Sequence, residues 1–253
     1  MITWCIRKIM PDRIAKVLWG DRGKWGLTVQ EDDPCWKEWK GVYLAFYDQN
    51  QRKGIGVRIN DAGYRVMSSI DLADKVLLEI GPGDIRHLPF WRDGKKPKEY
   101  IVADVQREMI DKAQATLSSA GISVRSLLVR RDSNILPLEE NSADVIITFY
   151  SLEHIYPLAP YLRELHRILR PGGVLIGAIP AEGGLAWGFG RALTSRRWLK
   201  RNTTIDPDKI ICWEHPNHAD EILSALDGVF KRRMTFLWPF PFLPLLDANL
   251  IVR

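Results

Sequence analysis

The chain has 253 residues, of which 46% are hydrophobic and 26% are charged. This length and composition are typical of one globular α/β domain with attachments or of two small domains, and they exclude a disordered, collagen-like or disulfide-dense protein. No apolar run reaches the roughly 18 residues that a membrane span needs, and the N-terminal stretch MITWCIRKIMPDR lacks the apolar run and cleavage site of a signal peptide. We therefore expect a cytoplasmic protein.

Cysteine usage and charge distribution add two expectations. The three cysteines, Cys5, Cys35 and Cys212, are far apart and lack CxxC spacing, so neither a disulfide framework nor a zinc cluster is predicted. The net charge of +5 is concentrated in two basic stretches, residues 1–24 and 191–201. Each stretch is either a solvated face or a contact with an anionic partner, for which we consider phosphate and the inner face of an anionic membrane.

Residues 1–70 are rich in tryptophan, glycine and mixed charge, which predicts a helical and irregular N-terminal extension. From residue 71 to 253 we expect one domain, because apolar or β-branched runs there alternate with helical stretches, as in a parallel sheet with crossover helices. The expected strands are 76–80, 100–104, 124–129, 143–149 and 173–179, and the expected helices are 107–120 and 158–169. Pro171-Gly172-Gly173 is expected to end the second helix just before the fifth strand.

The C-terminal third departs from this alternation. Residues 181–228 contain closely spaced glycines, a basic run and the segment EHPNH, and we expect an inserted lid or substrate segment there. Two strand-like segments, 230–237 and 248–253, would complete a seven-stranded sheet as a hairpin. The sequence thus predicts a Rossmann-like, doubly wound α/β fold with a mostly parallel sheet.

The most informative stretch is VLLEIGPGD (76–84), a buried strand that runs directly into a glycine turn. Gly81 and Gly83 let the backbone bend tightly and a ligand approach closely, at the end of the strand where open α/β sheets bind ligands. Asp104 ends the second strand, 21 residues after Gly83, where a carboxylate can accept hydrogen bonds from a ribose diol. The spacing predicts a nucleoside ligand.

Two nucleoside ligands fit this spacing, a nicotinamide dinucleotide and S-adenosylmethionine. A dinucleotide site usually has a third glycine three places after the second, close to the pyrophosphate, and Arg86 stands at that place. Asp84 beside the turn also opposes a diphosphate. S-adenosylmethionine lacks phosphate, and its ammonium group suits a carboxylate such as Glu79. The alternative for Glu79 is a merely solvated residue at a strand end.

The chain resembles class I S-adenosylmethionine-dependent methyltransferases of the type 11-like branch over about residues 75–180, in both order and spacing. The motifs that carry the resemblance are LEIGPGD (78–84), VADV (102–105), RDSNILPLEENSADVIITFYSLEHI (131–155) and LRELHRILRPGGVLIGAIP (162–180). The resemblance implies methyl transfer with S-adenosyl-L-methionine as cofactor. The chain departs from the family pattern at Ile85, where many members have another glycine.

The resemblance also implies which residues contact the cofactor: Glu79, Gly81, Pro82, Gly83, Asp104, Val105, Asp132, Ser133 and Tyr150. In the family pattern the residues around the glycine turn line the methionine part, Asp104 holds the ribose, and Asp132 with Ser133 lies beside the adenine. Tyr150 and His154 follow the fourth strand, near the transferred methyl group.

A hydroxyl acceptor needs help to lose its proton, and histidine is the usual general base. His154 is the best placed catalytic residue, with Glu214 and His215 in reserve, although packing or helix capping is an alternative role for it. His87 and His166 are expected at the surface. No metal is predicted, because the EHPNH segment has no further ligand at a suitable spacing.

Acceptor choice would lie in residues 182–218, which are polar, glycine-rich and aromatic and suit an acceptor with many hydroxyls. We therefore expect methylation of a hydroxyl on a small molecule or saccharide, and a fainter similarity to uncharacterised members linked to bacterial surface-polysaccharide pathways implies the same. The candidate substrate contacts are Trp187, Arg191, Arg196, His215 and His218.

Three other functions stay open. Methylation of RNA through the basic stretches predicts salt-dependent binding, but the chain has no recognised RNA-binding module, and nucleic acid is not the expected partner. A binding module could keep S-adenosylmethionine without turnover. An NAD-dependent oxidoreductase is disfavoured by Arg86 and by the lack of a Tyr-x-x-x-Lys pair in a helical stretch.

Overall fold

The computed structural model describes residues 4–50, 55–92 and 95–253, and within them a seven-stranded sheet has the order β3-β2-β1-β4-β5-β7-β6. Strands β1 to β5 are parallel, and β7 is antiparallel to both β5 and β6. The strands are β1 (Val76–Ile80), β2 (Glu99–Asp104), β3 (Val124–Leu128), β4 (Ala143–Phe149), β5 (Leu169–Pro180), β6 (Leu237–Trp238) and β7 (Ile251–Val252). The predicted doubly wound α/β fold is confirmed.

The sheet is buried on both faces, as a parallel sheet with crossover helices requires. All five residues of β1 are buried. Leu78 packs in one apolar cluster with Leu162 of α6 (Leu158–Ile168), and Leu77 packs in the other with Ala113 of α5 (Arg107–Ser119). Helix α10 (Ala219–Asp227) joins α6 on the first face, whereas α4 (Ile55–Tyr64) and the short helix η2 (Arg65–Ser69) cover the second.

Two expectations about strand boundaries are wrong. Pro171-Gly172-Gly173 does not separate α6 from β5, because α6 already ends at Ile168 and β5 begins at Leu169. These three residues instead form an irregularity within β5, where Gly172 has φ +82° and the pairing with β4 shifts register. The predicted hairpin of 230–237 and 248–253 shrinks to two paired residues on each of β6 and β7.

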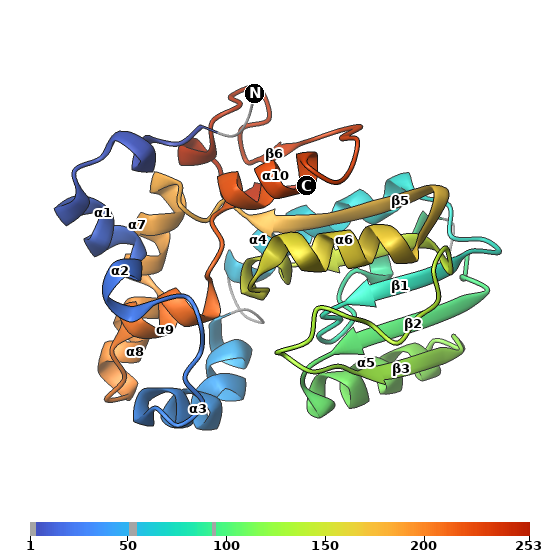
Figure 1. Cartoon of the computed structure of the whole chain (residues 1–253), viewed down its shortest axis with the longest axis horizontal. Helices are drawn as coiled ribbons and strands as arrows, with labels where there is room; N and C mark the ends of the chain where they lie inside the picture. Colours follow the sequence, from blue (N-terminus) through green and yellow to red (C-terminus); the bar gives the residue numbers. More distant parts are fainter. Residues whose placement is uncertain (1–3, 51–54, 93–94) are drawn as a thin grey trace.

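The N-terminal extension and the inserted segment fold together. Helices α1 (Asp12–Trp19), α2 (Arg22–Trp25) and α3 (Pro34–Asn50) pack with α7 (Leu185–Leu193), α8 (Ser195–Asn202) and α9 (Pro207–Glu214), and we call these six helices the helical unit (Figure 1, left). Its interior is a cluster built around the buried Trp36, Trp39 and Trp213. The sequence of the N-terminal extension has little helical periodicity. Burial of these large rings therefore contributes much of the packing energy that stabilises the helical unit.

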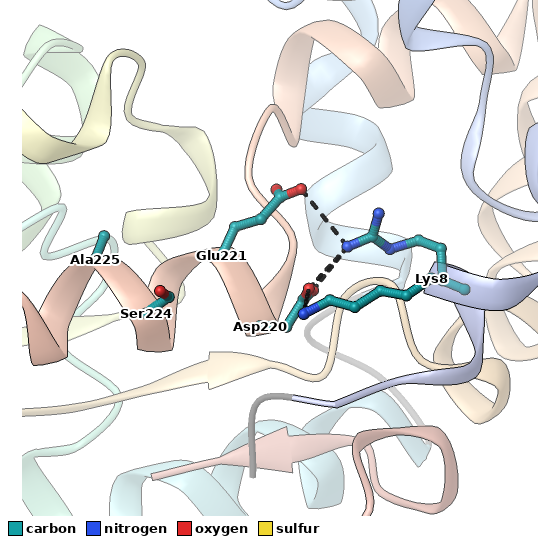
Figure 2. A pocket seen from close by; sticks show the side chains of 6 residues that line it. Lys8, Asp220, Glu221, Ser224 and Ala225 are labelled. Carbon is teal, nitrogen blue, oxygen red and sulfur yellow. Dashed lines mark hydrogen bonds and ion pairs between the residues drawn. The ribbon is translucent and has the colours of Figure 1, made fainter. Parts of the chain in front are cut away.

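The helical unit faces the carboxyl ends of the strands, toward which the arrowheads of β1, β2 and β5 point in Figure 1. The segment that precedes α1 is tied to α10. Arg7 and Lys8 lie 2.8 and 3.1 Å from the carboxylate of Asp220, which is 2% exposed, and Arg7 also reaches Glu221 (Figure 2). These residues line a shallow pocket of about 510 Å³ whose charges are already paired.

Candidate active site

The turn after β1 has the backbone conformation that the glycine motif predicts. Gly81 has φ +66° and Gly83 has φ +55°. Ser151, which follows β4, donates a hydrogen bond of 2.9 Å to the carbonyl of Ile80, and a Cβ on Gly81 would lie 2.4 Å from the Ser151 hydroxyl. Gly81 is therefore required both by its φ and by the close approach of the neighbouring strand end.

Ile85, the departure from the family pattern, adopts a left-handed backbone conformation that favours glycine. Its φ is +55°, which costs a β-branched residue about 1–2 kcal/mol. Its side chain is 1% exposed and packs in the second apolar cluster, and full burial of an isoleucine contributes about 1.5–3 kcal/mol. The burial thus offsets the backbone cost, and the turn keeps its shape without a third glycine.

Glu79 lies at the centre of a buried hydrogen-bond network and is not the solvated residue of the alternative reading. It is 1% exposed and accepts from the hydroxyl of Tyr100, and its Oε1 lies 3.0 Å from Nε2 of His87. Nδ1 of His87 accepts from the indole N–H of Trp91 at 2.9 Å, so Nε2 carries the proton that His87 donates to Glu79.

The expectation that His87 lies at the surface is wrong, since its side chain is 1% exposed. Sequence reasoning also missed Tyr100. Its pKa is raised well above the ordinary value by burial and by the charge of Glu79. The sequence signal for Tyr100 was Glu79 itself, because an acid within a buried apolar strand requires hydrogen-bond partners. Their identity depends on the register between β1 and β2, which the sequence does not specify. His166 is exposed, as expected.

Asp104 ends β2 beside the turn, where a ribose was expected. Burial raises its pKa to about 6, although the backbone N–H of Gln106, which donates to Oδ1 at 2.8 Å, works in the opposite direction. The neighbouring Val105 is 39% exposed. A half-buried carboxylate with an adjacent apolar side chain can bind a hydroxyl-bearing ring.

Asp132 and Ser133 lie on the loop after β3, and their adenine role stays a prediction. Asp132 is exposed, and the guanidinium of Arg130 at 2.7 Å holds its pKa below the usual range. Ser133 accepts from the backbone N–H of Ile135 at 3.2 Å, which fixes the loop locally.

Tyr150 lies directly after β4 and is anchored by α4. It has φ +56°, its hydroxyl donates to the carbonyl of Asn60 at 2.8 Å, and its ring lies 5.6 Å from that of Tyr64. Burial raises its pKa above the ordinary value. The side chain is therefore neutral and forms part of an aromatic wall.

His154 contacts Glu214 of the inserted segment and, through it, is linked to Trp39 of the N-terminal extension. Its Nδ1 contacts the backbone carbonyl of Glu214 and lies 3.3 Å from the Glu214 carboxylate, and the indole N–H of Trp39 donates to the other oxygen of that carboxylate at 2.9 Å. Burial alone would lower the pKa of His154, but the hydrogen bond and charge of Glu214 outweigh it and raise the pKa to about 9. The same pairing overcomes burial at Glu214 and lowers its pKa to about 2.

A second buried ion pair lies next to His154. Arg191 pairs with Glu182, which is 1% exposed, and Arg191 also lies 3.2 Å from Nδ1 of His215. Burial would raise the pKa of Glu182, but Arg191 and His215 lower it to about 2, whereas burial lowers the pKa of His215 to about 4. The rings of His154 and His215 are 4.6 Å apart, so the structure brings together the base candidate and both reserves.

Glu153 adds an unpaired acid to this region. It is 2% exposed, its Oε2 has no hydrogen-bond partner among the described residues, and burial raises its pKa to about 7. Burial, and not residue type, makes Glu153 distinctive, so its role becomes visible only in the structure.

The remaining substrate candidates have structural roles. Arg196 is buried and pairs with Asp208 and with the carbonyl of Val17, so the expectation that it meets an anionic substrate does not fit its position. His218 accepts from Arg22 at 3.0 Å and caps α10. Trp187 packs against the second apolar cluster. Within the ranges described, no group of three or more His, Cys, Asp or Glu side chains is placed to hold a metal ion.

The strand order and the polar groups at the carboxyl ends of β1, β2 and β4 agree with the Rossmann-like fold of class I S-adenosylmethionine-dependent methyltransferases. Residues 78–177 match the family model described as "Methyltransferase domain", so this part of the chain is a methyltransferase domain, whose class uses S-adenosylmethionine.

Known proteins extend the similarity beyond the matched domain. The chain is 30% identical over 171 residues to the phthiotriol/phenolphthiotriol dimycocerosates methyltransferase 1 of Mycobacterium ulcerans, covering 67% of this chain and 55% of that one. It is 28% identical over 152 residues to the mitochondrial arginine-hydroxylase NDUFAF5 of Danio rerio, covering 56% of this chain and 41% of that one. The chain thus spans about half the length of these relatives.

A solved structure supports the fold independently. The PH0226 protein of Pyrococcus horikoshii OT3 superposes with a TM-score of 0.56 at 16% identity, covering 84% of this chain and 95% of that chain. One curated relative is named a methyltransferase and another a hydroxylase, so the reaction must be inferred from the site itself.

The pairing with Glu214 predicts a charged His154 at neutral pH. In a histidine NMR titration of the intact protein, we expect a pKa of about 9 for His154. Glu214→Gln removes the charge and keeps an oxygen for only one of the two donors, Trp39 or His154, so burial should lower the pKa of His154 to about 6.5 or below. Glu139→Gln, at an exposed carboxylate, serves as the matched control and should leave the titration unchanged. An unchanged His154 titration in Glu214→Gln would remove the ion pair as the cause.

Proposed function

We propose that the protein transfers a methyl group from S-adenosylmethionine to a hydroxyl of a small molecule or saccharide, with His154 as general base. The observation that carries the proposal is the His154–Glu214 pair, which lies directly after β4 and across from the glycine turn of β1. Acid-paired histidine is the usual arrangement of a base that must accept a proton from a hydroxyl.

The residues at the strand ends fit the cofactor. Gly81 and Gly83, both with positive φ, form the tight turn that a nucleoside site at this strand end needs, and Asp104 offers a carboxylate for the ribose diol. The ammonium contact expected of Glu79 is less direct, since its carboxylate already has two partners from within the chain. When bound, the sulfonium supplies an electrophilic methyl group for an in-line displacement.

His154 would act through Nε2. Because Nδ1–H faces Glu214, Nε2 is the nitrogen that can take the acceptor proton. With a pKa of about 9, only about one molecule in a hundred has neutral His154 at pH 7 in the free protein. Proximity to a cationic sulfonium favours the neutral form of His154, which is the form that a base needs.

The charges of the site support a neutral acceptor. Glu182 pairs with Arg191, and Glu214 pairs with His154, so neither cation is left unpaired for an anionic substrate. Oε2 of Glu153 has no hydrogen-bond partner among the described residues, and it can accept a hydrogen bond from a hydroxyl. A sugar hydroxyl, as in surface polysaccharides, meets these requirements. An anionic RNA acceptor is less favoured at the site, because Arg191 and Arg196 of the basic run are buried in ion pairs, although other basic residues of the run are exposed.

The cofactor assignment predicts that the purified protein binds S-adenosylmethionine and S-adenosylhomocysteine but not NAD in isothermal titration calorimetry. Asp104→Ala should weaken S-adenosylmethionine binding at least about tenfold, because hydrogen bonds to a charged acceptor contribute about 1.5–3 kcal/mol each. Asp111→Ala, which removes an exposed acid from α5, is the matched control. Binding of NAD without binding of S-adenosylmethionine would contradict the cofactor assignment.

The base assignment predicts that His154→Ala lowers turnover by about 10²–10⁴-fold while S-adenosylmethionine binding stays nearly intact. Turnover is followed as S-adenosylhomocysteine release with a panel of sugars and sugar-containing acceptors. In the unaltered protein it should rise with pH through about 9, as His154 loses its proton. His166→Ala, at an exposed position on α6, is the control. Full turnover in His154→Ala would move the role to Glu153 or the inserted segment.

We also propose peripheral contact with an anionic membrane through α1 and α7, which lie side by side in Figure 1. Ile14 and Val17 of α1 are 51% and 64% exposed, and Phe189 and Leu193 of α7 are 57% and 71% exposed. Exposed basic residues on α1 and α8 add the charge that an interfacial surface needs: Arg13, Lys16, Arg197, Lys200 and Arg201. No helix in the described part of the chain is long and apolar enough to cross a bilayer.

This contact predicts that the protein sediments with anionic but not with neutral phospholipid vesicles at low salt. Ile14→Ser/Val17→Ser should reduce the bound fraction several-fold, because it removes the apolar side chains that enter the interface. Ile135→Ser, at a 72% exposed position on the loop after β3, is the matched control. Equal recovery with both kinds of vesicle would exclude the membrane contact.

A further inference from the structure

The carboxylate of Glu79 has hydrogen-bonding partners but no lysine or arginine partner within the described chain. Its side chain is 1% exposed, and its only close basic group is the imidazole of His87. Arg86, the cation of the adjacent turn, lies 3.6 Å from Asp61 of α4 instead. A buried carboxylate without a cation is unfavourable, because desolvation penalises its charge. A ligand that brings a positive charge to this strand end would therefore be stabilised by Glu79.

Three neutral side chains keep the charge on Glu79. The indole N–H of Trp91 is a donor only, so Nδ1 of His87 accepts from it at 2.9 Å and Nε2 carries the proton. Nε2 lies 3.0 Å from Oε1 of Glu79, and the hydroxyl of Tyr100 donates to Oε2. Burial and the charge of Glu79 raise the pKa of Tyr100, so its hydroxyl keeps its proton and stays a donor. Both oxygens of Glu79 face donors, which is the pattern of an ionised carboxylate.

Aromatic packing fixes the imidazole of His87 in this orientation. Its ring is stacked with those of Trp91 and Phe149, at centroid distances of 5.9 and 5.3 Å and interplanar angles of 19° and 23°. The ring of Tyr64 lies 6.3 Å away. Because His87 is 1% exposed, solvent does not compete for its Nε2 proton. The network around Glu79 is therefore organised before any ligand binds.

The register of the sheet brings this network to the end of β1 that precedes the glycine turn. Tyr100 pairs with Leu77 in the ladder between β2 and β1, so its side chain lies on the same face of the sheet as Glu79. Glu79 is two residues before Gly81. The methionine part of S-adenosylmethionine is expected at this turn, and that part carries the ammonium group of the cofactor. The ammonium group thus supplies the positive charge that Glu79 lacks.

We propose that Tyr100 and His87 are positioning residues for Glu79, which they keep charged and oriented so that the site selects a cofactor with an ammonium group. Trp91 acts one step further away, by fixing the tautomer of His87. Glu79 acts through its charge, because it is buried and its oxygens already face two donors. This selectivity rests on the cofactor assignment alone and is independent of the acceptor and of His154.

The two probes are S-adenosylhomocysteine and an analogue of it in which hydrogen replaces the amino group. In isothermal titration calorimetry the unaltered protein should bind S-adenosylhomocysteine at least about tenfold more tightly, because only this probe carries the ammonium group. Tyr100→Phe removes one hydroxyl and keeps the ring, and it should narrow the ratio of the two affinities at least about fivefold, because Glu79 loses a donor. Tyr43→Phe, on α3 of the helical unit, is the matched control and should leave the ratio unchanged.

The ratio distinguishes selectivity from a general effect on folding. Equal weakening of both probes in Tyr100→Phe would show a merely structural role for Tyr100 and overturn the proposal. Equal binding of both probes to the unaltered protein would overturn it as well. If the unaltered protein bound neither probe, the cofactor assignment itself would be contradicted, and the selectivity with it.

Nitrogen NMR of the histidine side chains provides a second measurement that needs no change at Tyr100. In the unaltered protein at neutral pH we expect His87 as the neutral Nε2–H tautomer, both with and without S-adenosylhomocysteine. Trp91→Phe removes the indole donor, so it should populate the Nδ1–H tautomer and narrow the same affinity ratio. A doubly protonated His87 in the unaltered protein would give Glu79 a cation of its own and overturn the proposal, and so would a predominant Nδ1–H tautomer.

Discussion

The carboxylate of Glu214 holds together three segments that are far apart in the sequence. It receives a hydrogen bond from Trp39 of the N-terminal extension, belongs to the inserted segment, and pairs with His154 directly after β4. A buried carboxylate is unfavourable without such partners, because desolvation penalises its charge. The position of the helical unit over the sheet and the protonation state of His154 therefore depend on the same interaction.

The buried charges also restrict the chemistry of the site. Two acids and two bases, Glu182 with Arg191 and Glu214 with His154, neutralise one another within the protein. A charged acceptor would add an unpaired charge beside these pairs, which is unfavourable in a largely desolvated site, so the pairs favour the neutral acceptor that we propose. A polar but neutral acceptor can instead use the hydrogen-bonding capacity that remains at Glu153.

Local sequence patterns specify some strands of the sheet, and pairing with distant strands specifies the others. Strands β1 to β4 were predicted within a residue or so, because each is a short apolar run bounded by turn or helix signals. Strand β5 and the C-terminal strands were less well predicted. The Pro171-Gly172-Gly173 signal is a local preference that the pairing with β4 overrides, and β6 and β7 exist only where a partner strand reaches them.

The sequence by itself determined the α/β class, the glycine turn and the acid at the end of β2, because these depend on local periodicity and on backbone freedom at single residues. It also identified His154, Glu214 and His215 as candidates. Only the tertiary structure decided that Glu79 is satisfied by Tyr100 and His87, that Arg196 turns inward, and that His154 is paired with Glu214. Burial and partner identity set these properties, and both arise from contacts between residues far apart in the sequence, such as His154 with Glu214 (60 positions) and Trp39 with Glu214 (175 positions).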